Sequence, residues 1–222
     1  MTTAAQKRSV TRKKGSGPET RRIILESAAK SFMERGYDNT SMTDIAKLVN
    51  IQPSAFYNYF KSKNEILFTI LEDIGWKMIT MCKEAVESVD SNDPRLQLEA
   101  FIRAHISYEI QHCKILPLID FHSFRATNDR SGLTKPQKKV VTDAQRELIR
   151  MIQDILKRGE QDGSFEFDDL TTTTFSLLAP IEHLIYWFES DKGRLSQSDV
   201  TENIIKFLMK ALDKTSRKTR KK

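Results

Sequence analysis

Apolar residues recur at intervals of three and four along most of this chain, which predicts a helical protein with few strands. The first such run begins near Glu19 and carries one apolar stripe from Ile24 to Phe32. Gly36 follows the run, and glycine readily adopts the left-handed conformation that ends many helices. The pattern therefore predicts a first helix that buries a single face.

A second, shorter helix is expected soon after Gly36. Its apolar positions run from Met42 to Val49 with helical spacing. Ser41 and Asp44 stand at the two positions of a capping box, in which each residue bonds the backbone N–H of the other. These signals place the start of the second helix at Ser41.

A tight turn and a third helix follow. Asn50 suits the turn, because asparagine tolerates the left-handed conformation better than other non-glycine residues. Pro53 suits the first turn of a helix, where its missing N–H has no intrahelical partner to lose. We expect this helix to extend from Pro53 to about Phe60 and to bury Phe56 and Phe60.

Three short helices with a tight turn before the last are typical of a helix-turn-helix, which lays its second helix in the major groove of DNA. The outer face of the third helix has suitable chemistry for that role. Ser54 and Ala55 are small enough for close approach, and Asn58 can pair with adenine edges. The hydroxyls of Tyr57 and Tyr59 can reach phosphates.

Other polar residues extend this interface. Thr40 and Ser41 place hydroxyl and free N–H groups at a helix N-terminus, which favours anions. Lys61 and Lys63 begin the next helix. The alternative for single residues is structural: tyrosines partly buried in the core and lysines that are only solvated.

The segment ILESAAKSFMERGYDNTSMTDIAKLVNIQPSAFYNYFKSKNEIL resembles the DNA-binding region of the TetR family of one-component transcriptional regulators. The F-x-x-x-G-Y turn, the I-A pair, the F-Y-x-x-F helix and the K-x-E-I exit appear in the family's order. Ser31 departs from the usual large apolar residue, and Asn50 from the usual glycine. The resemblance implies DNA contacts at Thr40, Ser41, Pro53, Ser54, Ala55, Tyr57, Asn58, Tyr59 and Lys63.

Charge is distributed unevenly along the 222 residues, whose formal net charge is +6. Residues 1–16 carry five Lys or Arg and no acid, and residues 214–222 carry six and no acid. The body between these tails has a net charge of −5. Both tails are poor in large apolar residues and are expected to be disordered. The N-terminal tail is suited to DNA phosphates or to a solubilising role.

The remaining pattern predicts further helices separated by clear breaks. A long helix is expected over 63–88, and another after Pro94. A third should run over 135–158 and be stopped by Gly159 and Gly163. Two more are expected at about 168–190 and 197–213.

The last two helices carry more apolar surface than one buried face needs. The resemblance to TetR regulators implies that they form a four-helix bundle across a two-fold axis, and we therefore expect a homodimer. The alternative is that the two helices bury each other within one chain.

The middle helices are expected to enclose a cavity for a small hydrophobic ligand. The alternative for each residue is an ordinary place in the core. The candidate lining residues are Phe101, His105, Tyr108, His112, Leu116, Phe121, Phe124, Met151, Ile155, Phe175 and Leu178.

A second, weaker resemblance suggests a ligand class. The segment WFESDKGRLSQSDVTENIIKFLM looks like the C-terminal region of TetR-type regulators of lipid and steroid catabolism, which implies an acyl-CoA ligand. Such a polyanion needs basic partners, and an uncharged hydrophobic compound or drug is the alternative. The candidate basic partners are Arg103, Arg125, Lys138, Lys139, Arg146 and Arg150.

Other classes of function lack support in the sequence. No apolar run approaches the roughly 18 residues of a membrane span, and two cysteines fit a reducing cytoplasm. His105, His112, Cys113 and His122 lack zinc-site spacing, and no P-loop, Rossmann or G-x-S-x-G motif occurs. We therefore expect no enzyme, metal or cofactor.

The sequence thus predicts an all-α chain with a basic tail over 1–16 and a three-helix helix-turn-helix domain over 17–64. A helical ligand-binding and dimerisation domain should occupy 65–213, before a second basic tail over 214–222. The predicted function is a ligand-responsive regulator on double-stranded DNA with a palindromic operator, by family default a repressor. The alternative is a helical adaptor or ligand-binding protein that does not bind an operator.

Overall fold

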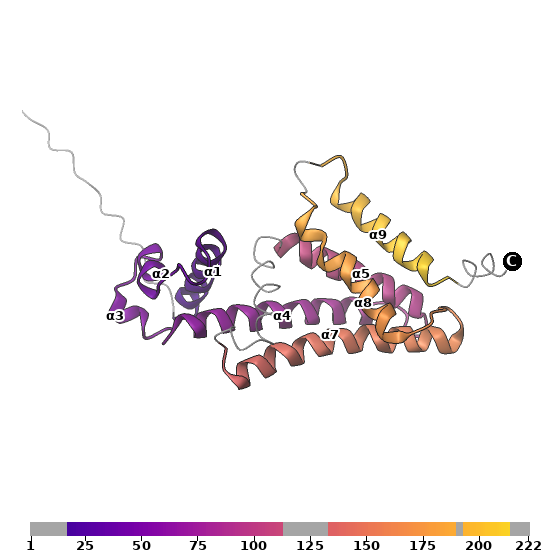
Figure 1. Cartoon of the computed structure of the whole chain (residues 1–222), viewed down its shortest axis with the longest axis horizontal. Coiled ribbons are helices and arrows are strands. Elements are labelled where there is room, and N and C mark those ends of the chain that lie inside the picture. Colours follow the sequence, from indigo (N-terminus) through magenta and orange to yellow (C-terminus); the bar gives the residue numbers. More distant parts are fainter. Residues whose placement is uncertain (1–16, 113–132, 190–192, 214–222) are drawn as a thin grey trace, which may run out of the picture. The chain divides into compact units, whose positions relative to one another are not determined.

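The computed structural model describes residues 17–112, 133–189 and 193–213, and every regular element in these ranges is a helix. The chain divides after Lys63 into two compact units (Figure 1). The expected basic tails, 1–16 and 214–222, and the segment that carries Phe121, Phe124 and Arg125 lie outside the described residues.

The first unit contains α1 (Gly17–Arg35), α2 (Met42–Leu48) and α3 (Pro53–Phe56). Gly36 ends α1 with a φ of 86°, a conformation that glycine adopts without a Cβ clash. The three helices share one small apolar core. It consists of Ile24, Ala28, Ala29, Phe32, Ile45, Ala46, Phe56 and Phe60, none more than 3% exposed.

The turn between α2 and α3 follows the sequence prediction. Asn50 has a φ of 55°, and Ile51 donates its backbone N–H to the carbonyl of Ala46 at 3.0 Å. Pro53 lies in the first turn of α3. The left-handed residue at position 50 thus turns the chain three residues before the new helix begins.

The third helix is shorter than predicted, because α3 ends at Phe56 rather than near Phe60. The N–H groups of Asn58 and Tyr59 bond to carbonyls three residues back, which tightens the coil into consecutive turns. The tighter coil still places Phe60 in the core, where it is fully buried.

The second unit consists of α4 (Lys63–Glu87), α5 (Pro94–His112), α7 (Lys135–Asp162), α8 (Leu170–Glu182), the 3₁₀ turn η1 (Leu184–Tyr186) and α9 (Gln197–Ala211). Helix α5 is central and packs against α7, α8, η1 and α9. Side chains of α4 join the same core through Ile79, Cys82 and Val86. This arrangement buries the apolar positions that predicted the helices.

The sequence suggested that Gly159 would end α7, but the helix continues to Asp162. It is capped by Gly163, which has a φ of 80°. Gly159 instead makes room for the buried ring of Phe165. A Cβ at position 159 would lie 2.1 Å from the Cδ2 atom of that ring. The absence of a side chain at Gly159 therefore allows Phe165 to pack, and only Gly163 caps the helix.

Helix α8 differs from its predicted limits of about 168–190, whereas the last helix begins at residue 197 as predicted. Asp169 caps α8, which ends at Glu182. Pro180 lies inside α8, two residues before its end. Ser196 caps α9 in a reciprocal capping box with Asp199, so the final helix begins at Gln197.

Among the described residues, no helix is long and apolar enough to cross a membrane.

Candidate DNA-binding face and effector cavity

The recognition segment from Pro53 to Phe60 has one buried and one exposed side. Phe56 and Phe60 are fully buried and fix the segment on the core of the first unit. Tyr59 is half-buried. The remaining predicted contact residues are exposed and lie on the other side: Pro53, Ser54, Ala55, Tyr57 and Asn58. This surface offers small, amide and phenol side chains to an approaching partner.

Ser41 is exposed at the N-terminus of α2, where it accepts a hydrogen bond from the N–H of Asp44 at 3.1 Å. Its own hydroxyl and N–H bond the Asp44 carboxylate at 2.6 and 3.0 Å. These hydrogen bonds lower the pKa of Asp44 below its ordinary value. The capping box predicted from the spacing is therefore formed, and it holds the start of α2 in place.

Thr40 has a structural role that the sequence did not suggest. Its side chain is 1% exposed, and its hydroxyl donates to the carbonyl of Gly36 at 2.9 Å. The same oxygen lies 3.3 Å from the hydroxyl of Ser31, which is also buried. Because the Thr40 hydroxyl points into the protein, it is not placed for a phosphate. The serine at position 31, unusual for the family, is its polar neighbour.

Lys63 is half-buried, and its ammonium group bonds the carbonyl of Tyr37 at 2.6 Å. The ammonium also lies 4.3 Å from the centre of the Tyr37 ring, a cation–π contact. Lys63 therefore holds the loop after α1 in addition to any contact it makes with DNA.

Arg21 is a neighbour of the recognition segment that the sequence prediction missed. Its guanidinium carbon lies 4.5 Å from the centre of the Phe60 ring. The contact joins α1 to the end of the recognition segment. No sequence signal pointed to it, because the two residues are far apart along the chain.

The two units carry opposite charge. Residues 17–63 contain seven Lys or Arg and five Asp or Glu, a net charge of +2. Residues 64–213 contain 18 and 25, a net charge of −7. The positive unit is the one that presents the recognition segment.

The second unit contains a cavity of about 440 Å³ between α4, α5, α7, α8 and η1. This volume lies within the usual range for small-molecule sites. Most of the lining is apolar, with five polar side chains among the described residues. The polar ones are Glu72, His105, Glu109, Gln145 and Glu182. The apolar ones are Leu71, Trp76, Met78, Ile79, Val140, Val141, Ala144, Leu148, Ile149, Phe175, Leu178 and Ile185, with Gly75 beside them.

The predicted lining residues divide between cavity and core. His105, Phe175 and Leu178 line the cavity. Phe101, Tyr108 and Ile155 are buried core residues outside this lining, and Met151 is partly buried against the same core. His112 stacks on the Tyr108 ring, 4.0 Å between centres. Residues on the same apolar stripe of a helix can therefore differ, because some face the cavity and others face the core.

The deepest polar groups on the cavity are His105 and Glu109, 0% and 4% exposed. The Nε2 atom of His105 lies 3.3 Å from the Oε1 atom of Glu109, within ion-pair range but outside hydrogen-bond geometry. In the described part of the chain, both ring nitrogens of His105 and the Oε2 atom of Glu109 lack hydrogen-bond partners.

Cys82 is a buried neighbour of Glu109. Burial, and then the Glu109 carboxylate, raises the pKa of the Cys82 thiol to about 12, so this thiol stays protonated at neutral pH.

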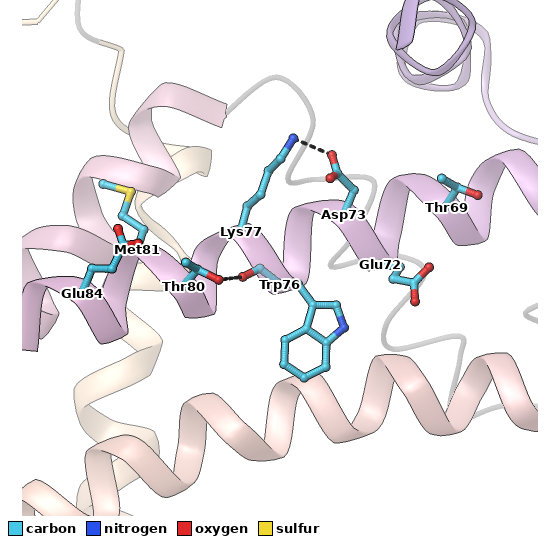
Figure 2. A pocket seen from close by; sticks show the side chains of 8 residues that line it. All are labelled: Thr69, Glu72, Asp73, Trp76, Lys77, Thr80, Met81 and Glu84. Atoms are coloured by element: carbon cyan, nitrogen blue, oxygen red, sulfur yellow. Dashed lines mark hydrogen bonds and ion pairs between the residues drawn. The ribbon is translucent and has the colours of Figure 1, made fainter. Parts of the chain in front are cut away.

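Figure 2 shows the α4 wall from a shallower depression on that helix, which Glu72 and Trp76 also line. The Trp76 indole and the Glu72 carboxylate lie on the side of α4 that faces α7, whereas Lys77 and Asp73 pair on the other side at 2.7 Å. Glu72 and Trp76 were not among the predicted lining residues. They therefore form the boundary between the cavity and the outer surface of α4.

Comparison with known proteins identifies this arrangement. The profile "Bacterial regulatory proteins, tetR family" matches residues 24–70, and the profile "Tetracyclin repressor-like, C-terminal domain" matches residues 91–212. The chain belongs to the TetR family. It is a DNA-binding transcriptional regulator of that family, and the all-helical fold with an N-terminal helix-turn-helix is confirmed.

Several members of the TetR family are similar over most of the chain. The HTH-type regulator YhgD of Bacillus subtilis is 23% identical and covers 87% of this chain and 97% of its own length. The HTH-type repressor KstR2 of Mycolicibacterium smegmatis is 29% identical over 69% of this chain and 71% of its own. The crystal structure of AibR with isovaleryl coenzyme A and operator DNA matches with a TM-score of 0.72 and 22% identity, covering 86% and 98%.

Proposed function

We propose that this TetR-family regulator binds a pseudo-palindromic operator as a homodimer and is released from it by a small hydrophobic effector held in the cavity. The observation that carries the proposal is the exposed face of the recognition segment, where Ser54, Ala55, Tyr57 and Asn58 lie opposite the buried Phe56. A structural adaptor has no need of small, amide and phenol side chains gathered on one exposed helix face.

Exposed apolar residues support the dimer. Four large apolar side chains of the segment from η1 to α9 are more than 40% exposed and lie outside the cavity lining: Tyr186, Trp187, Leu195 and Phe207. A monomer leaves this surface in water, whereas a second copy covers it. Two recognition helices related by a two-fold axis then enter successive major grooves, with half-site centres ~34–36 Å apart or a multiple of that spacing.

The position of α4 supports a link between effector and DNA. This helix begins at Lys63, the last residue of the first unit, and several of its residues line the cavity: Leu71, Glu72, Gly75, Trp76, Met78 and Ile79. An effector that prefers one position of α4 shifts the spacing of the recognition helices. A 100-fold preference corresponds to about 2.7 kcal/mol of coupling.

The named relatives favour repression and the binding of a small ligand. KstR2 is a repressor, and the AibR structure holds both a small ligand and operator DNA. By analogy, this regulator represses its target genes until the effector binds.

The first test is selection of bound fragments from a genomic DNA library with the full chain. We expect recovery of short inverted repeats, and an Asn58→Ala variant should then prefer different bases. A Tyr57→Ala variant should bind all sequences more weakly without changing the preference, because it is assigned to phosphate. Recovery of no common sequence, or variants that bind like the wild type, would favour the adaptor.

A further inference from the structure

We propose that the cavity is selective for a hydrophobic amine, with a protonated nitrogen at the buried Glu109 and an apolar body against α4, α7 and α8. This inference rests on the proposed function, because it names the chemical class of the effector. It is carried by the charge and hydrogen-bond state of the residues that line the cavity.

The cavity wall is acidic. Three carboxylates line it: Glu109 on α5, Glu72 on α4 and Glu182 at the end of α8. Among the described lining residues there is no Lys or Arg. Even if His105 is protonated, the lining retains a net negative charge. A cation in this low-dielectric space is therefore stabilised, and an anion is repelled.

Two buried residues that line the cavity, His105 and Glu109, have hydrogen-bonding atoms without a partner among the described residues. The Oε2 atom of Glu109 is an acceptor without a partner in the described part of the chain, although Glu109 is only 4% exposed. Buried carboxylate oxygens are normally hydrogen-bonded, and an unpaired one marks a place where a donor belongs. An ammonium group supplies up to three such donors and the opposite charge.

His105 completes this polar end. Its ring is fully buried and packs edge-on against Phe101 with 5.7 Å between centres. Neither ring nitrogen has a hydrogen-bond partner within residues 17–112, 133–189 and 193–213. A neutral imidazole offers one acceptor and one donor. The ring can therefore accept a hydrogen bond from the same ammonium group that bonds Glu109.

The rest of the cavity suits an apolar body. Trp76 and Phe175 present aromatic rings, and the flat faces of such rings attract cations as well as apolar groups. Leu148 and Leu178 contribute aliphatic surface. A simple polyamine lacks the apolar part that this surface would bury.

An acyl-CoA fits this cavity poorly. Its phosphates require Lys, Arg or helix N-termini. The described basic residues predicted for that role do not line the cavity: Arg103 pairs with Glu202, and Lys139, Arg146 and Arg150 pair with acids on α7. Lys138 is likewise absent from the described lining.

The test uses three probes with one apolar body and different heads: 3,3-diphenylpropylamine, 3,3-diphenylpropan-1-ol and 3,3-diphenylpropanoic acid. Isothermal titration of the full chain at pH 7.5 measures each affinity. The amine is protonated at this pH, as a lysine side chain is. We expect the amine to bind at least tenfold more tightly than the alcohol, and the acid to bind more weakly than the alcohol.

Two variants assign the preference to the cavity. Glu109→Gln and Glu72→Gln keep the side-chain size and remove one negative charge, so each should reduce the amine affinity about tenfold and leave the alcohol affinity unchanged. The matched control is Glu84→Gln, an exposed position on α4 that lines only the outer depression (Figure 2). This control should bind all three probes like the wild type. The half-buried Glu72 keeps the test decisive if Glu109→Gln does not fold.

Four results would overturn the inference: binding of none of the probes, tighter binding of the acid, an amine preference that survives both cavity variants, or loss of amine binding in Glu84→Gln. The proposed function is tested separately by adding each probe to the protein–DNA complex. Selective amine binding without DNA release would retain the cavity assignment and contradict the effector mechanism.

Discussion

The two units treat buried polar groups in opposite ways. In the first unit the buried hydroxyls of Ser31 and Thr40 contact each other, and Thr40 also donates to the Gly36 carbonyl. In the second unit the buried His105 and Glu109 line the cavity, and both ring nitrogens of His105 and the Oε2 atom of Glu109 have no hydrogen-bond partner among the described residues. Satisfied polar groups hold a structure together, whereas unsatisfied ones are available to a ligand.

The charges of the two units reinforce this contrast. The first unit is positive and exposes its polar recognition residues to the outside. The second is strongly negative and turns three carboxylates towards an internal space. The net charge of the whole chain therefore conceals two different sites: a surface suited to a polyanion and a cavity suited to a cation.

The largest expected effect lies in the second unit, at two adjacent residues of α9. Phe207 is 69% exposed, whereas Leu208 is 2% exposed. Phe207→Asp should leave the fold intact and weaken the proposed dimer at least 100-fold, about 2.7 kcal/mol, because it places a charge in the proposed apolar interface. Leu208→Asp should instead prevent folding. Sedimentation velocity and circular dichroism separate the two outcomes.

Leu96→Asp is the matched control for that experiment, since Leu96 is a 45% exposed leucine on α5. This variant should remain a dimer with unchanged operator affinity. A Phe207→Asp protein that stays dimeric would place the interface elsewhere on the chain.

A second effect concerns packing inside the second unit. Gly159→Ala should lower the free energy of unfolding by about 1–3 kcal/mol, because the added methyl group collides with the Phe165 ring. Gly75→Ala is the control: its Cβ would lie 3.7 Å from Ala144, an ordinary contact, and alanine should stabilise this helix by up to about 1 kcal/mol. Urea unfolding measures both. If both variants gained stability, the close packing at Gly159 would be wrong.

Thr40→Val tests whether the first unit uses its buried hydroxyl for structure. The change removes the donor to Gly36 and should cost about 1–3 kcal/mol of stability. The dependence of operator affinity on salt should not change, since no phosphate contact is lost. Ser54→Ala, at an exposed position, should alter stability by less than about 0.5 kcal/mol. A reduced salt dependence in Thr40→Val would restore Thr40 to the DNA contacts.

The smallest effect concerns the capping box of α2. Its hydrogen bonds from Ser41 lower the pKa of Asp44 in the folded state, so ionised Asp44 stabilises the fold above the pKa of the unfolded chain. That contribution should disappear as the pH falls from about 4 through the lower folded-state pKa. Asp44→Asn should therefore be less stable than wild type at pH 7, and the difference should shrink below pH 4. A difference that is independent of pH would show that the carboxylate charge has no role.

Most of the first unit could be predicted because its signals are local. Gly36, the Ser41–Asp44 pair, Asn50 and Pro53 each act on backbone within a few residues. The burial of the Thr40 hydroxyl could not be predicted, because a threonine before a helix has the same local sequence whether its hydroxyl faces solvent or the core. Only its contact with Ser31, nine residues away, decides this question.

The cavity could be predicted only in part, because its lining depends on how helices far apart in sequence meet. Phe101 and His105 are one helical turn apart, yet Phe101 lies in the core outside the lining and His105 lines the cavity. Glu72 and Glu109 have the sequence appearance of ordinary surface acids. They line the cavity because α4 and α5 pack against other helices. The spacing of apolar residues along the sequence carries no information about that packing.

The two tryptophans of the chain provide built-in optical probes of two different events. Trp76 lines the cavity and is 42% exposed, so a ligand that covers its indole changes its emission. Trp187 is 59% exposed beside η1, on the surface that we assign to the dimer. Replacing either one with phenylalanine leaves a protein with a single tryptophan, whose emission can be excited selectively over that of the five tyrosines. Emission from Trp76 alone then follows ligand entry, and emission from Trp187 alone follows subunit association.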